Sequence, residues 1–218
     1  AYPPLTRKNL REAVETSLRS LQVPFIDLYQ LHAWDDETPL SETLGALEDL
    51  RYEGKIRFIG CSNFTPLQFC RSLRWQEAHG ASKFSTIQPI YNLVHREIED
   101  ELIPLCREKH IAILTYSPLG AGFLTGKYTP DGTFPKGARF DIKPSHTRHY
   151  YNDHGWRTVE HLRQSSEKLG VSMVNLALSW VIKQPGTTST LIGARKIEHV
   201  DQAFVSDALE ADFIPLSG

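Results

Sequence analysis

The chain has 218 residues, of which 40% are hydrophobic and 23% are charged, and its formal net charge is −2. These values are ordinary for a globular protein with one large domain, and the near-neutral charge argues against a surface that tracks nucleic-acid phosphates. The longest apolar runs are much shorter than the roughly 20 residues that span a bilayer, so we expect no membrane insertion. The start of the chain, AYPPLTRKNLREAVE, lacks the apolar segment of a signal peptide.

The cysteines and histidines predict neither a disulfide framework nor a metal site. Cys61, Cys70 and Cys106 are an odd number of thiols without CxxC spacing, so a reducing cytoplasm is the simplest compartment. The segment HTRHYYNDH holds histidines with some metal-like spacing, namely His146, His149 and His154. Because no cysteine or framing helix accompanies them, we interpret them as polar loop residues.

Helical and strand patterns alternate through the first half of the chain. A helix is expected over residues 7–20, and the apolar run FIDLYQL that follows is typical of a strand buried on both faces. The segment TPLSETLGALEDLRYEGK predicts a helix with Thr38 as its cap, Pro39 at its first position and Gly54 at its end. After the strand IRFIGCSN, a second Thr-Pro start begins the helix TPLQFCRSLRWQEAHG.

The alternation continues along the rest of the chain. We expect a strand in STIQPIYN, a helix in REIEDELIPLCREKH and a strand in IAILTYSPL. A loop rich in glycine, proline and histidine then covers about residues 120–154. Helices are predicted over about 156–169 and in SMVNLALSWVIKQPG, followed by the strand STLIGA and a helix from about Ile197 to Ala208.

Five strands that alternate with helices predict βα repeats and a parallel sheet. Their even spacing favours a (β/α)8 TIM barrel over a doubly wound sheet, which would show a G-x-G-x-x-G turn after one strand. A complete barrel of this kind has eight strands, so we expect this sequence to cover about five of them with their helices. The prediction is therefore an α/β fold, one domain over residues 1–218 and a long active-site loop at about 120–154.

In a (β/α) barrel the active site forms where the strands end, and this rule selects residues without any motif. The selected residues are His32 after the first strand, Ser62 and Asn63 after the second, Gln88 to Asn92 after the third, Tyr116 and Ser117 after the fourth, and Gly193 and Arg195 after the fifth. Any one of them is more simply read as a polar loop residue. Together they predict one polar mouth.

Several segments resemble the aldo-keto reductase superfamily: DLYQLH, GKIRFIGCSNF, LIGARKIEHV and the long segment QPIYNLVHREIEDELIPLCREKHIAILTYSPLGAGFLTGKY. The resemblance runs in order from about residue 7 to residue 205, in the branch shared by bacterial reductases and the β subunits of voltage-gated potassium channels. It implies a TIM barrel that binds NADP(H) across its mouth. It also implies reduction of aldehydes or ketones to alcohols by hydride transfer, with a small carbonyl compound as the substrate.

The resemblance assigns roles around the substrate carbonyl. His32 matches the active-site histidine, whose imidazole N–H orients and polarises the carbonyl oxygen as negative charge develops there. A histidine bonded to backbone in the core is the plainer alternative. Trp34 is expected to line the substrate side. Asp35 and Asp36 resemble a catalytic pair of carboxylates only superficially, because adjacent residues rarely converge on one centre, and we assign them to the rim.

The nicotinamide end of the cofactor is assigned to four further residues. Ser62, Asn63 and Gln88 match the positions that hold the carboxamide, which needs both donors and acceptors. Tyr116 matches an aromatic that stacks on the nicotinamide ring, and simple core packing is its alternative explanation.

The phosphates are assigned to loops after the last strands. The loop over the pyrophosphate, whose backbone N–H groups bond phosphate oxygens, consists of Ser117, Pro118, Leu119 and Gly120. Lys127 matches a cationic contact to the same phosphates. Arg139 is a second candidate, for which a solvated surface charge is the alternative.

The adenosine end is assigned to the segment LIGARKIEHVDQA. Gly193 is expected to allow close backbone approach before a helix, and Arg195 matches a position beside the 2′-phosphate, which favours NADPH over NADH. His199 and Gln202 fall where the family contacts the adenine. The chain departs from the family at His199, where a Gln is more usual, and at Ala203, where an Asn is common, so we expect altered adenine contacts.

The family's catalysis uses an Asp, a Tyr and a Lys beside the histidine, and these normally precede the helix over residues 7–20. No residue of this chain takes their place by motif, since Tyr29 and Asp27 are spaced for the barrel wall. We therefore expect the chain as given to be catalytically incomplete, with those partners upstream of it and His32 as the one member it contains.

Two other functions remain open from the sequence. One is a non-catalytic NADP(H)-binding sensor or regulatory module with the same fold, as in channel β subunits. The other is a different (β/α) barrel enzyme that uses His32 as a general base on a phosphorylated sugar. No feature of the sequence predicts an oligomeric state.

Overall fold

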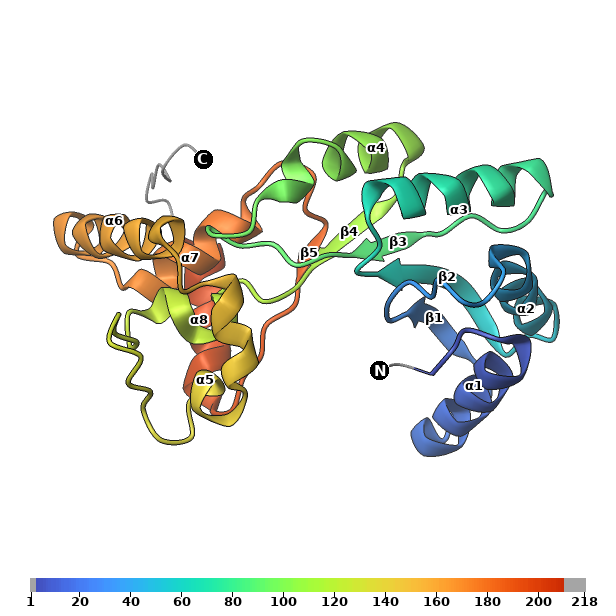
Figure 1. Ribbon diagram of the computed structural model, residues 1–218, viewed down its shortest axis with the longest axis horizontal. Helices are drawn as coiled ribbons and strands as arrows, with labels where there is room; N and C mark the ends of the chain where they lie inside the picture. Colours follow the sequence, from blue (N-terminus) through green and yellow to red (C-terminus); the bar gives the residue numbers. More distant parts are fainter. Residues whose placement is uncertain (1–2, 210–218) are drawn as a thin grey trace. The chain divides into compact units, whose positions relative to one another are not determined.

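A computed structural model describes residues 3–209 of the chain (Figure 1). The α-helices are α1 Arg7–Leu21, α2 Leu40–Tyr52, α3 Pro66–Ala78, α4 Leu102–Lys109, α5 Arg139–Ile142, α6 Asp153–Leu169, α7 Met173–Ile182 and α8 Ile197–Asp207. The strands are β1 Ile26–Leu31, β2 Ile56–Ser62, β3 Thr86–Gln88, β4 Ala112–Thr115 and β5 Ser189–Thr190. Short 3-10 helices are η1 Glu97–Glu99, η2 Gly120–Thr125 and η3 Pro144–His149.

The described chain divides into two compact units. The first unit contains the residues up to Pro89 and Glu101–Ile113, and the second contains Ile90–Asp100 and the residues from Leu114 onward. The strands form one sheet in the order β1-β2-β3-β4-β5, and every neighbouring pair is parallel. This arrangement confirms the predicted α/β class with a parallel sheet of five strands.

The first unit is a parallel sheet with helices packed alongside it. Its rows of paired residues run straight across the strands, with Gln30 opposite Gly60, Gly60 opposite Thr86, and Ser62 opposite Gln88. Helices α1, α2 and α3 accompany β1, β2 and β3 (Figure 1). The core between them is apolar and almost fully buried, and it includes Val14, Leu47, Leu50, Ile56, Phe69 and Ile87. Strands with apolar residues on both faces are expected where helices cover a parallel sheet.

The helix starts predicted at residue 7 and at the second Thr-Pro pair are confirmed. The hydroxyl of Thr65 accepts the Gln68 N–H at 3.2 Å, and the Gln68 side chain accepts the Thr65 N–H at 2.9 Å, which makes a reciprocal capping box. The helix over residues 7–21 is capped by Thr6 as a lone side-chain acceptor. The prediction for α2 was wrong by one residue, because Pro39 is the cap and Thr38 lies outside the helix. The Thr38 side chain instead bonds the carboxylate of Asp35.

The second unit is built around an aromatic cluster. Tyr128 and Phe140 stack with ring centroids 4.4 Å apart, and Phe123 and Tyr150 lie next to them at 5.6 Å from each other. All four side chains are 3% exposed or less. The helices α6 and α7, the 3-10 helix η2 and the segment with Tyr91, Leu93 and Val94 contribute further apolar side chains to this core. The cluster shows how a loop predicted as irregular is held in place, since Phe123, Tyr128, Phe140 and Tyr150 all lie within it.

The expected elements are shortened where proline interrupts them. The strand predicted in STIQPIYN ends at Gln88, because Pro89 has no N–H to continue the ladder. The helix predicted over REIEDELIPLCREKH is divided into η1 and α4. Pro104 lies in the first turn of α4, the part of a helix where a missing N–H costs nothing.

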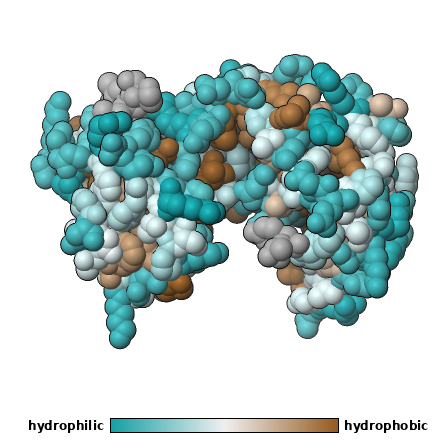
Figure 2. Space-filling model, viewed as in Figure 1, coloured by the Kyte–Doolittle hydropathy of each residue, from teal (hydrophilic) through white to brown (hydrophobic). Residues whose placement is uncertain are grey.

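The visible surface of the protein is mostly hydrophilic, with apolar patches between the polar regions (Figure 2). In residues 3–209, no helix has the length and apolar character needed to cross a membrane.

Charged side chains link helix α1 to the segment between α2 and β2. The guanidinium of Arg11 binds both carboxylate oxygens of Glu53, at 2.7 and 2.5 Å. Lys55 lies 3.0 Å from the same carboxylate and 2.7 Å from Glu15. Hydrogen bonds from Arg11 and Lys55 lower the pKa of Glu53 to about 2.

We predict that Glu53→Gln lowers the stability of the chain in a pH-dependent way. Because the folded-state pKa of Glu53 is depressed, its contribution is complete above its ordinary pKa of 4.5 and is lost as the pH falls to about 2. Urea unfolding followed by circular dichroism should therefore show a variant deficit at neutral pH that shrinks to nothing near pH 2. Glu12→Gln, at an exposed position of helix α1 next to Arg11, is the matched control. A deficit that does not change with pH would contradict the prediction.

Candidate functional site

The carboxyl ends of β1, β2 and β3 are joined by hydrogen bonds between the predicted site residues. The Ser62 hydroxyl donates to the backbone oxygen of Gln88 at 2.7 Å, and the Asn63 side-chain amide donates to the backbone oxygen of His32 at 2.9 Å. The same Asn63 amide also contacts the Ser62 hydroxyl at 3.0 Å. The structure thus brings His32, Ser62, Asn63 and Gln88 together at one edge of the first unit's sheet.

Asn63 adopts a left-handed backbone conformation at this edge, with φ of 58°. Asparagine tolerates this conformation better than most residues, because its short amide bonds nearby backbone groups. The turn brings the Asn63 N–H to 3.3 Å from the Gln88 oxygen, which therefore accepts from two donors. The backbone at the edge is fixed by these bonds.

The side chain of Gln88 is held by a residue that the sequence analysis did not select. The Gln30 amide donates to the Gln88 side-chain oxygen at 2.8 Å, and the Thr86 hydroxyl donates to the Gln30 side-chain oxygen at 2.8 Å. Gln30 stands two residues before His32 on β1. The available signal was a second polar residue, after Asp27, in the mostly apolar run FIDLYQL.

His32 and Trp34 line a cavity of about 600 Å³ in the first unit. The Trp34 ring meets Phe64 edge to face, with centroids 5.1 Å apart, and its indole N–H donates to Asp36 at 2.7 Å. Asp35 accepts the N–H groups of Leu5 and Glu37 at 2.7 and 2.9 Å. Both aspartates are therefore engaged in holding the loop, as expected for rim residues.

A second cavity, of about 540 Å³, lies wholly within the second unit. We call it the cationic cavity, because Lys127, Arg139 and Arg195 line it and no carboxylate does among the described residues. Its walls include most of the predicted cofactor residues of this unit, namely Tyr116, Ser117, Pro118, Leu119, Lys127, Arg139, Gly193, Arg195, His199 and Gln202. It also includes His146, which the sequence analysis had assigned to the loop without a role.

The loop after β4 is shaped by left-handed residues and by a buried asparagine. Ser117 has φ of 56°, and its backbone oxygen accepts from the side-chain amide of Asn92 at 3.0 Å. At Gly122, which has φ of 88°, an added Cβ would lie 2.7 Å from the ammonium nitrogen of Lys127. Glycine at this position therefore lets the lysine approach the loop backbone.

Gly120 was predicted to belong to the loop over the pyrophosphate. It does not line the cationic cavity, and an added Cβ there would lie 2.8 Å from the ring of Tyr150. Its φ of 56° and the tyrosine beside it make it a packing residue under the loop. Gly193 lines the cavity, and an added Cβ there would meet no atom within 4 Å. No other part of the described chain therefore comes close to this glycine.

Arg195 connects the cavity wall to the loop that carries Arg139. Its guanidinium donates to the backbone oxygen of Gly137 at 3.3 and 3.5 Å, two residues before Arg139. Its backbone N–H donates to the Nδ1 of His199 at 3.3 Å, at the start of α8. Arg139, Arg195 and His199 are thus held together on one side of the cavity.

The charges in the cavity act on one another. Desolvation by the loop lowers the pKa of Lys127, and the Arg195 guanidinium lowers it further. Burial and then the neighbouring Arg139 lower the pKa of His146. Mutually repelling cations that line a cavity with no carboxylate among its described residues favour an anionic ligand.

The histidines of the loop do not form a metal site in the described part of the chain. No group of three or more His, Cys, Asp or Glu side chains there is arranged to hold a metal ion. His149 accepts a hydrogen bond from Arg148 at 3.1 Å, and its ring lies 6.1 Å from that of His95.

Parallel βα units whose strand ends carry the polar groups place this chain among the TIM-barrel α/β proteins. The profile of the Aldo/keto reductase family matches residues 2–212, and the chain belongs to that family. The resemblance drawn from the sequence motifs is confirmed by this match.

Individual relatives support the same assignment. The chain is 35% identical to Protein tas of Escherichia coli over 223 residues, covering 94% of this chain and 64% of that protein. It is 34% identical over 206 residues to the NADH-specific methylglyoxal reductase of the same organism, covering 91% of this chain and 59% of that protein. The structure of the glycerol dehydrogenase AKR11B4 from Gluconobacter oxydans matches with a TM-score of 0.76 and 33% identity, covering 98% of this chain and 62% of that one.

The chain thus spans less than two thirds of the length of these relatives.

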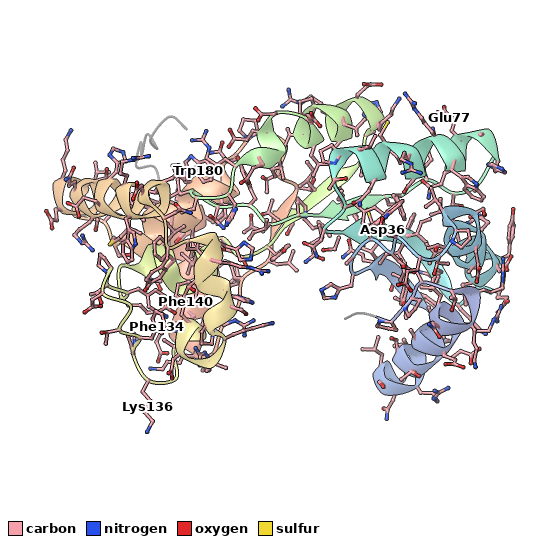
Figure 3. The ribbon with its side chains drawn as sticks, viewed as in Figure 1. Asp36, Glu77, Phe134, Lys136, Phe140 and Trp180 are labelled. Carbon is pink, nitrogen blue, oxygen red and sulfur yellow. The ribbon has the colours of Figure 1, made fainter. Side chains whose placement is uncertain are left out.

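Phe140 holds the loop that supplies Arg139 to the cationic cavity. Its ring is fully buried and packs against Phe134 with centroids 6.0 Å apart. The two rings meet edge to face, and Lys136, between them in the sequence, points away into solvent (Figure 3).

We predict that Phe140→Ala destabilises the protein by about 3–5 kcal/mol, because it removes a buried aromatic ring and leaves a cavity. Phe134→Ala, at a half-buried position in the same cluster, should cost clearly less. Denaturant unfolding of both variants tests the order, and equal losses would show that Phe140 is not the anchor.

Proposed function

We propose that this chain binds NADPH and orients the carbonyl group of a small aldehyde or ketone for reduction to the alcohol. The observation that carries the proposal is the cationic cavity, which Lys127, Arg139 and Arg195 line without a carboxylate among the described residues. NADPH carries three phosphate groups, so a cavity with this charge suits its anionic part. Membership of the aldo/keto reductase family supports the same cofactor class.

The residues of the cavity fit particular parts of the cofactor. The loop from Ser117 offers backbone N–H groups, and Gly122 leaves room for Lys127 beside that loop, an arrangement suited to a pyrophosphate. Arg195 precedes helix α8 and offers a planar guanidinium for the 2′-phosphate. His199 and Gln202 lie on α8 and are assigned to the adenine.

The strand ends of the first unit are assigned to the nicotinamide. The Ser62 hydroxyl and the Asn63 amide lie 3.0 Å apart, and the Ser62 hydroxyl also bonds the backbone oxygen of Gln88, whose side chain adds a second amide; such groups suit a carboxamide. Tyr116 is assigned to stacking on the ring. NADPH, when bound, supplies the hydride.

His32 has the chemistry needed at the substrate oxygen. Hydride addition builds negative charge on that oxygen, and an N–H donor aimed at it stabilises the charge. His32 lines a cavity, and the Asn63 amide fixes its backbone through the bond to its carbonyl oxygen. Trp34 supplies an apolar wall to the same cavity, as expected for a small carbonyl substrate with an aromatic or aliphatic group.

The proposed compartment is the cytoplasm. Cys61, Cys70 and Cys106 are all free thiols, and Cys61 and Cys106 are buried. Burial raises the pKa of the Cys106 thiol to about 12, so it stays protonated and unreactive. Thiols kept in this form suit a reducing environment.

Replacement of Arg195 tests the cofactor preference. Arg195→Ala should raise the dissociation constant of NADPH by about 10- to 100-fold, because a charged hydrogen bond to the 2′-phosphate is lost, and change that of NADH little. Lys196→Ala is the matched control, since this neighbouring cation does not line the cavity. Equal effects on both cofactors would overturn the 2′-phosphate role. The comparison matters because one relative carries the name NADH-specific methylglyoxal reductase.

Turnover tests the role of His32. The intact protein should consume NADPH with small aromatic or aliphatic aldehydes, followed through the ultraviolet absorbance of reduced nicotinamide. His32→Ala should lower kcat by about 10²- to 10³-fold, as loss of one oxyanion donor does, with the NADPH dissociation constant nearly unchanged. NADPH binding without turnover across a broad aldehyde panel would instead support a sensor. A large loss of cofactor affinity in His32→Ala would place His32 in the cofactor site.

A further inference from the structure

The 3-10 helix η3 places a histidine in the wall of the cationic cavity. Pro144 begins this helix, and the N–H of His146 donates to the backbone oxygen of Lys143 at 3.1 Å. Tyr150 follows the helix, and its N–H donates to the backbone oxygen of Thr147 at 2.9 Å while its side chain is buried. These bonds fix the backbone of η3 and hold His146 where it lines the cavity.

The groups beside His146 disfavour a charged ring. Burial lowers the pKa of His146, and Arg139, Lys143, His149 and Arg148 lower it further, in that order. Arg139 belongs to α5, which packs against η3. Because the ordinary pKa of histidine is already 6.5, these neighbours favour the neutral imidazole at neutral pH.

The other titratable groups of the cavity wall add no negative charge. They are Lys127, Arg195 and His199, besides the arginine of α5. The carboxylate of α5, Asp141, is not among the lining residues and accepts the N–H of Gly137 at 2.7 Å. Within the described part of the chain, the cavity wall therefore gives His146 no carboxylate partner.

An anion in the cavity reverses this balance. A negative charge within about 4–6 Å favours the imidazolium and raises the pKa of the ring. A ligand that raises the pKa of a group binds the protonated chain more tightly than the neutral one, so its binding draws a proton from the solvent. Arg139 and Arg195 cannot act in this way, because guanidinium groups stay charged at every physiological pH.

We propose that His146 takes up a proton from the solvent when an anionic ligand enters the cationic cavity, which couples ligand binding to pH. The inference rests on the proposed function, because the anion concerned is the phosphate part of NADP(H). The proton goes to the unprotonated nitrogen of the imidazole, and no bond of the ligand changes. Affinity therefore rises as the pH falls through the pKa of the bound state, and it levels off below the pKa of the free chain.

His199, the second histidine of the cavity wall, is less suited to this role. Its Nδ1 accepts the backbone N–H of Arg195 at 3.3 Å. The neutral ring therefore carries its proton on Nε2, and a second proton would go to Nδ1 and break this bond. Protonation of His146 breaks no such bond to Arg195.

Titration calorimetry of the full chain with NADP⁺ tests the coupling. Binding heats measured in two buffers that differ in ionisation enthalpy give the number of protons taken up. The unsubstituted chain is compared with His146→Gln, so that titration of the 2′-phosphate of NADP⁺ contributes equally to both. At about pH 7.5 the two chains should bind almost equally, because the ring is mostly neutral there.

At about pH 5.5 the unsubstituted chain should bind NADP⁺ about fivefold more tightly than His146→Gln, for a pKa difference of about one unit between bound and free chain. It should also take up more protons on binding than the variant near neutral pH. A loss of affinity in His146→Gln that is the same at both pH values, with unchanged proton uptake, assigns the residue a structural role and overturns the inference. The proposed function survives that result.

Three further variants identify the group that titrates. His146→Arg carries a fixed charge, so it should bind NADP⁺ more tightly than the unsubstituted chain at about pH 7.5 and lose the additional proton uptake. His154→Gln, which removes a histidine that does not line the cavity, should behave like the unsubstituted chain. Proton uptake that is lost in His199→Gln and kept in His146→Gln overturns the inference. Failure of the unsubstituted chain to bind NADP⁺ at either pH overturns the proposed function together with it.

Discussion

The hydrogen bonds that join the carboxyl ends of neighbouring parallel strands are the interaction on which the site of this protein depends. Each parallel strand delivers its last residue to the same edge of the sheet, where the ladder can no longer satisfy the backbone. Here the side chains of Ser62 and Asn63 take over, bonding the carbonyl oxygens of Gln88 and His32. The side chains that bond the backbone at the strand ends are also the ones assigned to cofactor binding. The stability of the edge and the geometry of the site therefore have one cause.

Two glycines also shape the site, because they have no side chain. Gly60 opens a gap between β1 and β3 for a polar contact, and Gly122 opens one for the ammonium of Lys127. An added Cβ would come within 2.1 Å of the Thr86 hydroxyl oxygen at Gly60, and at Gly122 it would displace the flexible end of Lys127. Each gap gives a polar or charged group the space that a side chain at the glycine would otherwise occupy. The positions of these glycines are therefore part of the site, even though neither residue has a side chain to bind a ligand.

In the second unit an apolar core supports a cavity lined by cationic side chains, with no carboxylate among the described lining residues. The aromatic cluster around Phe123, Tyr128 and Phe140 holds a loop with little regular secondary structure. Arg139 directly precedes the buried Phe140, and the Gly137 carbonyl is bonded by Arg195. The apolar anchor and the Arg195 bond together hold the loop of Arg139 beside Arg195, despite the repulsion between the two cations. The cationic cavity is an electrostatic site that depends on aromatic packing.

The sequence by itself determined the family, the parallel α/β class and the residues at every strand end, because local sequence patterns predict each of these. Apolar runs, Thr-Pro helix starts and the motif around Tyr116 need no knowledge of distant contacts. Prolines set the boundaries of the short β3, the interrupted helix before β4 and the cap of α2. The sequence patterns did not predict these boundaries correctly. Only the tertiary structure decided that His146 joins the cavity wall, that Gly120 is a packing residue, and that Gln30 meets Gln88. Gln30 and Gln88 are far apart in the sequence, and they touch because three strands pair in one register around a glycine. Strand register is a property of the folded sheet, and no local sequence pattern predicts it.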